Sequence, residues 1–220
     1  MNRPDFSNYV AHFTKAPQKG FTGKDSAAES QIAAVSGGAI GRLISILTSR
    51  TILATNMPWT GLPAVPFTEC PWWSLIDHTA RYSPYGVGFT KEHLFNSGGA
   101  PAIYMRPDHY NKQKYNPGWN PHVDAFVTPY APKHAFKTAF KNRYAHLNRK
   151  GHGTDYSHER EWRVPHNFTF ELSAVQFVVV KSHQDVATVV NSIGTGLSQD
   201  KFLIMDMYKR IEELWPTHKI

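Results

Sequence analysis

The spacing of apolar residues along the chain predicts short strands that alternate with short helices. Residues Tyr9 to Thr14 are predicted to form a short strand. The strongest strand pattern runs from Ala174 to Val180, because this segment is rich in β-branched valine. Further strands are predicted at residues 52–53, 64–68, 85–89, 102–105 and 162–170.

Helices are predicted where apolar residues recur every three or four positions. Ser26 and Glu29 form a capping-box pattern at the start of one helix, which Gly37-Gly38 interrupts. The Ile and Leu residues at 40, 43, 44 and 47 mark one face of a second helix. Other helices are predicted at residues 71–76, 91–96, 133–144, 186–193 and 202–215. Residues 57–66 contain three prolines and a glycine, and residues 106–122 are polar and contain proline, so both segments are predicted to be loops.

This order of elements lacks a regular strand–helix–strand repeat and predicts an α+β fold. Apolar residues make up 41% of the chain and aromatic residues 13%, which is enough for one domain over residues 1–220. Cys70 is the single cysteine, so a reducing compartment is expected. We find no signal peptide and no apolar run long enough to cross a bilayer. These observations predict a cytoplasmic protein without a membrane partner.

The formal charge is +7, and the basic residues are concentrated between Lys112 and Arg163. Aromatic residues lie among them, and this mixture suits single-stranded nucleic acid because cations bind phosphates and rings stack on bases. A solvated basic face over an aromatic core has the same composition. The sequence leaves both interpretations open.

Several common catalytic motifs are missing. The chain has no P-loop, no G-x-G-x-x-G motif and no G-x-S-x-G nucleophile elbow. It also has no H-E-x-x-H pair, and Cys70 has no second cysteine to share a metal with. His152 and His158 flank a glycine-containing loop, but two histidines alone do not define a metal site. No metal is therefore predicted.

Two short segments contain candidate site residues on one strand face each. His12 and Thr14 share a face of the first strand, where an imidazole and a hydroxyl could bind the hydroxyls of a sugar. Glu159, Glu161 and Arg163 share a face of a later strand. Such acids form either salt bridges with arginine or a site that stabilises positive charge developing on a sugar. A structural histidine and a structural ion pair remain the alternatives.

The third segment runs from Tyr85 to Lys91. Its glycines at 86 and 88 would let a flat ligand approach the backbone, and Lys91 could bind a phosphate or activate a nucleophile. An ordinary buried strand that ends in an exposed lysine is the alternative.

The order of these segments resembles that of two protein families. The strand His12-Phe13-Thr14, the helix around Leu43 to Leu47, and the Tyr85-to-Lys91 strand followed by Pro101 to Tyr104 resemble DarT-like ADP-ribosyltransferases. That family has an arginine where this chain has Lys91. Residues 66–69, 85–89 and 159–163 also resemble the AbiGi group of phage-resistance proteins.

The first resemblance implies an ADP-ribosyltransferase-like split β-sheet with flanking helices and a cleft that binds NAD as a substrate. It implies that Glu161 is the catalytic glutamate, with Glu159 as the alternative, and that Lys91 assists the acceptor or the pyrophosphate. The residues implied to bind NAD are His12, Thr14, Tyr85 and Phe89.

The implied function is a toxin that ADP-ribosylates RNA or DNA in a toxin–antitoxin system of anti-phage defence by abortive infection. Such an enzyme would require a neutralising antitoxin protein as a partner. Two other classes remain open. One is a non-enzymatic AbiGi-like antitoxin or interaction component, and the other is a ribonuclease that uses His152, His158 and Glu159.

Overall fold

The computed structural model of the protein describes residues 6–15, 27–57, 59–69, 75, 79, 83–130 and 157–214. The predicted helices at 71–76 and 133–144 lie outside these residues, apart from Leu75, and so do Cys70, His152 and the side chain of His158.

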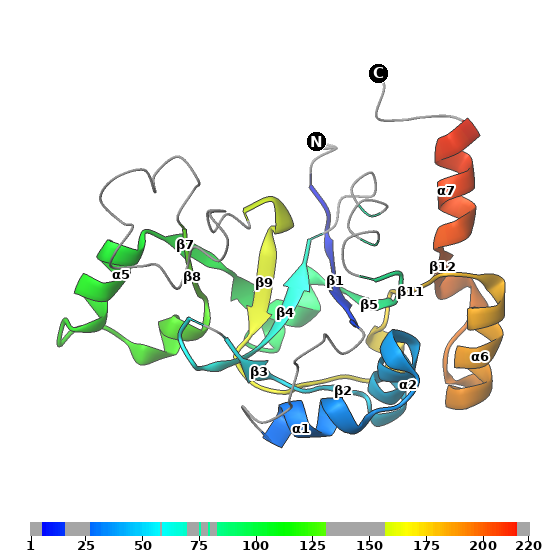
Figure 1. Cartoon of the computed structure of the whole chain (residues 1–220), viewed down its shortest axis with the longest axis horizontal. Coiled ribbons are helices and arrows are strands. Elements are labelled where there is room, and N and C mark those ends of the chain that lie inside the picture. Colours follow the sequence, from blue (N-terminus) through cyan, green and yellow to red (C-terminus); the bar gives the residue numbers. More distant parts are fainter. Residues whose placement is uncertain are drawn as a thin grey trace.

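A mixed sheet of eight strands forms the centre of the described part of the chain (Figure 1). Its order is β12-β11-β5-β1-β4-β9-β6, with β3 paired to β4. Neighbours are antiparallel except β11 and β12, which are parallel. The strands are β1 (Tyr9–Phe13), β3 (Thr55–Asn56), β4 (Pro63–Thr68), β5 (Gly86–Thr90), β6 (Ala100–Pro101), β9 (Glu161–Val164), β11 (Phe177–Val180) and β12 (Phe202–Ile204).

Side chains cap the first turns of α4 and α6, whereas α2 begins after a glycine. Gly37, with φ of 82°, precedes α2, and the side chain of Thr90 accepts a hydrogen bond from the backbone of His93 at the start of α4. Ser182 and Asp185 form a capping box on α6. The helices are α1 (Ala27–Ala34), α2 (Gly38–Ser49), α4 (Lys91–Asn96), α5 (Pro107–Lys114), α6 (His183–Ile193) and α7 (Met205–Leu214). The predicted α+β fold is confirmed.

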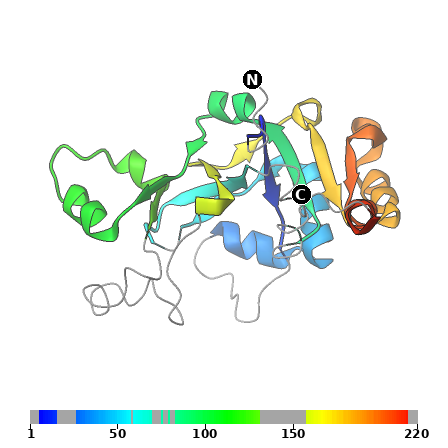
Figure 2. The ribbon, with the colours of Figure 1, turned by 90° about the horizontal axis from the view of Figure 1, so that it is seen from above.

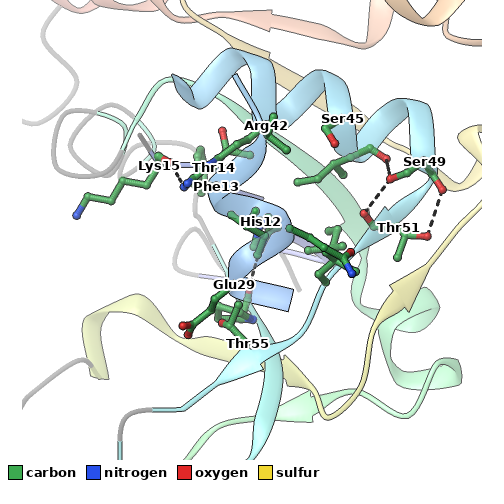
Figure 3. Close-up of a pocket in the computed structure, with 17 residues that line it drawn as sticks. His12, Phe13, Thr14, Lys15, Glu29, Arg42, Ser45, Ser49, Thr51 and Thr55 are labelled. Atoms are coloured by element: carbon green, nitrogen blue, oxygen red, sulfur yellow. Dashed lines mark hydrogen bonds between the residues drawn. The ribbon is translucent and has the colours of Figure 1, made fainter. Parts of the chain in front are cut away.

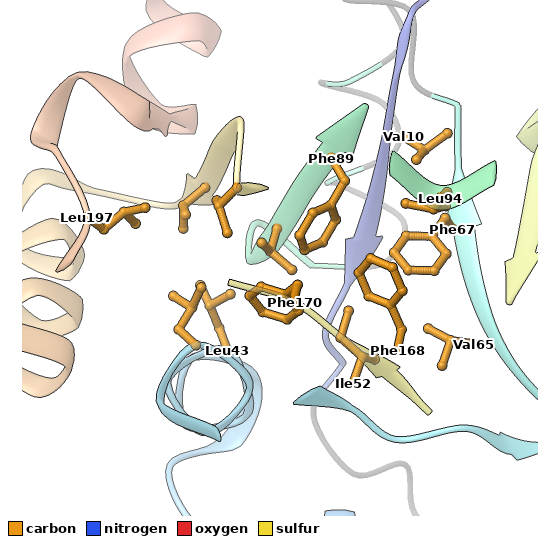
Figure 4. Close-up of a cluster of buried hydrophobic side chains, with 14 of the residues drawn as sticks. Val10, Leu43, Ile52, Val65, Phe67, Phe89, Leu94, Phe168, Phe170 and Leu197 are labelled. Atoms are coloured by element: carbon orange, nitrogen blue, oxygen red, sulfur yellow. The ribbon is translucent and has the colours of Figure 1, made fainter. Parts of the chain in front are cut away.

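The main hydrophobic core lies between one face of the sheet and α2 (Figure 4). Phe67 and Phe89 from the sheet pack against Phe168 and Phe170, and Leu43 from α2 completes the cluster. Phe168 belongs to β10 (Phe168–Thr169), which pairs with β2 (Thr51–Ile52) in a separate two-stranded sheet. The strand predicted at 162–170 is therefore two strands, because the chain leaves the main sheet after Val164.

Atoms of neighbouring strands, rather than a ligand, occupy the space beside the glycines of β5. A Cβ atom on Gly88 would lie 2.3 Å from the ring of Phe177 on the neighbouring strand β11. A Cβ atom on Gly86 would lie 2.9 Å from the carbonyl oxygen of His12. Close packing of strands and an aromatic ring thus explains both glycines.

Residues 103–129 form a lobe, here named the α5 lobe, at the far left of Figure 2. It contains the parallel strands β7 (Ile103–Met105) and β8 (Val127–Pro129), with α5 and the 3-10 helix η1 (Pro121–Ala125) between them. The prediction of a loop over residues 106–122 is wrong at Pro107–Lys114, which form helix α5. Pro107 stands in the first turn of this helix, and Tyr110 is buried against Trp119. So few apolar positions produce no helical periodicity in the sequence.

No single helix in the described ranges is long and apolar enough to cross a membrane. The pair α1 and α2 meets the length and composition criteria only when taken together, and it is bent by 115°.

Candidate functional site

A cavity of about 570 Å³ lies beside the C-terminal end of β1, between α1, α2 and the strands β2 and β3 (Figure 3). Its size falls within the range of about 300–1,000 Å³ that is typical of small-molecule sites. His12, Thr14 and Arg42 are among its polar lining residues, and Ile32 and Ile46 are among its apolar ones. The sequence predicted the first two as ligand-binding residues, and both line this cavity.

His12 presents a hydrogen-bond acceptor to the cavity. Its Nδ1 lies 2.8 Å from the carbonyl oxygen of Pro66, which can only accept, so Nδ1 carries the proton. Burial lowers the pKa of His12 below its usual value, against the opposing effect of the hydrogen bond to Pro66. The ring is therefore neutral at pH 7, and Nε2 is left with a lone pair.

Thr14 has a structural role next to this cavity. Its hydroxyl lies 2.7 Å from the carbonyl oxygen of Ala39 and 3.3 Å from that of Tyr85. The side chain thus joins the end of β1 to α2 and to the residue before β5. The single hydroxyl proton is already donated within the protein, so only its oxygen lone pairs could serve a ligand.

Glu161 is held by a two-point ion pair with Arg163. Arg163 Nε donates to Glu161 Oε1 at 2.8 Å, and Nη2 donates to Oε2 at 2.7 Å. The Arg163 side chain is 0% exposed and that of Glu161 is 11% exposed. Glu161 and Arg163 thus form the structural ion pair that was the alternative to a catalytic site in this segment.

Arg163 also joins the sheet to the α5 lobe. Its Nη1 donates to the carbonyl oxygens of Ala125 at 3.1 Å and Val127 at 3.0 Å, and Nη2 donates to the hydroxyl of Thr128. Trp59 Nε1 donates to the same Val127 oxygen at 2.7 Å. The guanidinium therefore uses its donors inside the protein, which explains why an arginine can be fully buried here.

The strand registers place His12 and Glu161 on opposite faces of the sheet. Glu161 lies opposite Thr68, and Thr68 lies opposite Ala11. Residues opposite each other in antiparallel strands point to the same face, and successive residues alternate. His12, which follows Ala11, thus points away from the face that carries Glu161. The structure does not bring the predicted catalytic glutamate to the predicted NAD-binding strand face.

Lys91 lies in a third location, at the N-terminal end of β1. Its Nζ is 2.7 Å from Glu69 Oε2, 3.9 Å from the ring centre of Phe6 and 5.6 Å from that of Trp162. Glu69 also accepts a hydrogen bond of 3.0 Å from the backbone of Ser7. Glu69 is a largely buried carboxylate that the sequence reasoning missed, although its place at the end of a predicted strand was a usable signal.

The remaining predicted residues serve the core or lie apart from the cavity. Phe89 is fully buried, and its ring centre lies 4.9 Å from those of Phe168 and Phe170. The Tyr85 hydroxyl donates to Asp185 on α6 at 3.3 Å. Glu159 belongs to the 3-10 helix η5 (Ser157–Glu159) before β9. Burial and the charges of Glu161 and Glu159 raise the pKa of Tyr104, a neighbour that the sequence reasoning also missed.

Fold and site together define an α+β protein with a ligand-sized cavity beside β1. The ion pair of Glu161 and Arg163 lies separately, on the other face of the sheet. The family model “Putative abortive phage resistance protein AbiGi, antitoxin” matches residues 52–199, which is more than half of the chain. The protein therefore belongs to the AbiGi family, and the AbiGi resemblance in the sequence is confirmed.

No curated protein and no solved structure matches the chain. Nothing in these comparisons supports the DarT-like resemblance. The matched residues include β9 with Glu161 and Arg163, whereas β1 with His12 and helix α7 lie outside them.

Proposed function

We propose that this protein is the antitoxin of an abortive phage-resistance system and that it acts by binding a toxin protein. The observation that carries this proposal is the AbiGi family match over residues 52–199. The geometry disfavours the catalytic role implied for Glu161, because this residue is paired with Arg163 on the sheet face opposite His12. A carboxylate that already forms two hydrogen bonds with a buried arginine has little capacity left to stabilise a developing charge.

The test is growth of a bacterial host that expresses the toxin of the same defence system. Co-expression of the wild-type protein is expected to restore growth, and the protein alone is expected to be harmless. His12→Ala, at the cavity, should neutralise the toxin as well as the wild type does. If the protein alone arrests growth, and His12→Ala abolishes that arrest, the antitoxin proposal is wrong.

NAD-dependent transfer of ADP-ribose to nucleic acid is a second candidate, favoured by one specific observation. His12 and Thr14 line the same cavity, as an NAD site built on β1 would require. Lys112 and Lys114, which are exposed on α5, would contribute basic surface for a single-stranded acceptor. Most of the other basic residues of the stretch from Lys112 to Arg163 lie outside the described residues, and Arg163 is buried.

Incubation with labelled NAD and single-stranded DNA or RNA tests this second candidate. If the protein is an antitoxin only, NAD is expected to remain intact and neither nucleic acid to become labelled. Labelling that disappears in both His12→Ala and Glu161→Gln, with the two variants still folded, would establish the transferase instead. Cleavage of the RNA without NAD would point to the ribonuclease.

A further inference from the structure

The cavity beside β1 contains one hydrogen-bond acceptor whose orientation is fixed by the protein, His12 Nε2. The opposite ring nitrogen, Nδ1, donates to the carbonyl oxygen of Pro66 at 2.8 Å, and the ring meets that of Phe67 edge-on, with the ring centres 5.8 Å apart. Nε2 forms no hydrogen bond with any of the described residues, and the side chain lines the cavity. Its lone pair is therefore available to a ligand that donates an O–H or N–H group.

Two hydroxyl groups lie on other walls of the same cavity. Ser45 is on α2 and Thr55 is on β3, and both side chains line the cavity, as Figure 3 shows. Neither hydroxyl has a hydrogen-bond partner among the described residues. Because a hydroxyl group both donates and accepts, each of them can bind a second polar group of the same ligand.

The rest of the lining favours an uncharged, apolar ligand. Ile32 of α1 and Ile46 of α2 contribute apolar surface to the cavity. Arg42 Nη1 donates to the backbone carbonyl of Lys15, and Arg42 Nε and Nη2 are buried, as is Oε2 of Glu29. The ammonium group of Lys15 points away from His12 in Figure 3. An ion that entered this space would lose its hydration without an open counter-charge to replace it, which is costly.

We propose that this cavity binds an uncharged, mainly apolar small molecule whose O–H or N–H group donates to His12 Nε2. A cavity of about 570 Å³ with apolar walls and a few placed polar groups has the usual form of such a site. Most of the lining residues precede residue 52 and so lie outside the family-matched residues 52–199. The inference therefore does not rest on the antitoxin proposal.

Indole is a suitable probe because it is uncharged and apolar and has a single N–H donor. 1-Methylindole has the same ring system with the donor blocked, which makes it the matched control ligand. An NMR titration of the full chain is expected to give a Kd for indole below about 1 mM. 1-Methylindole should bind at least about tenfold more weakly, because it leaves the acceptor of His12 buried without a donor. His12→Phe has no acceptor and should bind the two ligands with affinities within about twofold of each other.

A cavity-filling variant tests the same proposal without changing His12. Ile32→Trp places a large ring in the cavity from α1 and should abolish the binding of indole and of 1-methylindole. Ala33→Trp is the matched control, because Ala33 is exposed on the same helix and does not line the cavity. This control should bind indole as the wild type does. Circular dichroism would establish that the three variants are folded.

Three results would overturn the proposal: no binding of indole by the wild type, equal affinities of the wild type for indole and 1-methylindole, or equal losses in Ile32→Trp and Ala33→Trp. NAD has a charged pyrophosphate and should not displace indole. Displacement by NAD would assign the cavity to the transferase candidate instead. Ile32→Trp should still neutralise the toxin, so failure of the ligand proposal and failure of the antitoxin proposal can be told apart.

Discussion

Replacement of Arg163 by methionine is expected to lower the free energy of unfolding by about 3–5 kcal/mol. The substitution leaves the carboxylate of Glu161 without its buried counter-ion. It also removes the donors that satisfy the carbonyl oxygens of Ala125 and Val127 and the hydroxyl of Thr128. Urea denaturation of the variant and the wild type measures this difference as a shift of the midpoint.

Arg50→Met is the matched control for this prediction. Arg50 forms an ion pair with Glu171 at 2.7 Å, the same length as the contact between Arg163 Nη2 and Glu161. The Arg50 and Glu171 side chains are 52% and 73% exposed, so water screens the pair and its loss should cost less than about 1 kcal/mol. Equal effects of the two substitutions would show that burial does not determine the contribution of Arg163.

Phe89→Ala is expected to lower the free energy of unfolding by about 3–5 kcal/mol through the cavity that it leaves. The Phe89 ring is fully buried and lies at the centre of the cluster formed with Phe67, Phe168 and Phe170. Neighbouring rings on both sides limit how far this site can collapse. Urea or thermal unfolding followed by circular dichroism measures the loss.

Phe95→Ala on α4 removes the same side chain from a position that is 68% exposed, and it should change stability by less than about 0.5 kcal/mol. A role of Phe89 in binding NAD makes the opposite prediction. Phe89→Ala would then lose NAD affinity while its unfolding curve stayed like that of the wild type.

Most secondary structure in the described ranges follows from local patterns. The β1 strand, the α2 helix with Leu43 and Leu47 inward, and α4 at residues 91–96 all form where the sequence pattern predicts them. Helix α5 was not predicted, because a single buried tyrosine and a first-turn proline do not create a helical period. The C-terminal helix was predicted as amphipathic, but only the packing shows that Met205 faces inward while Met207 and Ile211 stay exposed.

The candidate site was predictable only in pieces. The sequence identified His12 and Thr14 as sharing a strand face, and both line the cavity beside β1. It also identified Glu161 and Arg163 as sharing a face, and they form an ion pair there. Phe89, which the resemblance assigned to NAD, is a core residue instead.

Side-chain alternation within each strand was determined by the sequence itself, because it has a fixed period of two residues. Whether two distant strands present those faces to the same side is a property of the tertiary structure. It depends on the registers of β1 with β4 and of β4 with β9, and a slip of one residue at either pairing would reverse the answer. The observed registers place Glu161 on the side of Ala11, away from His12. The tertiary structure alone therefore decided that the two predicted halves of one site are two separate features of this protein.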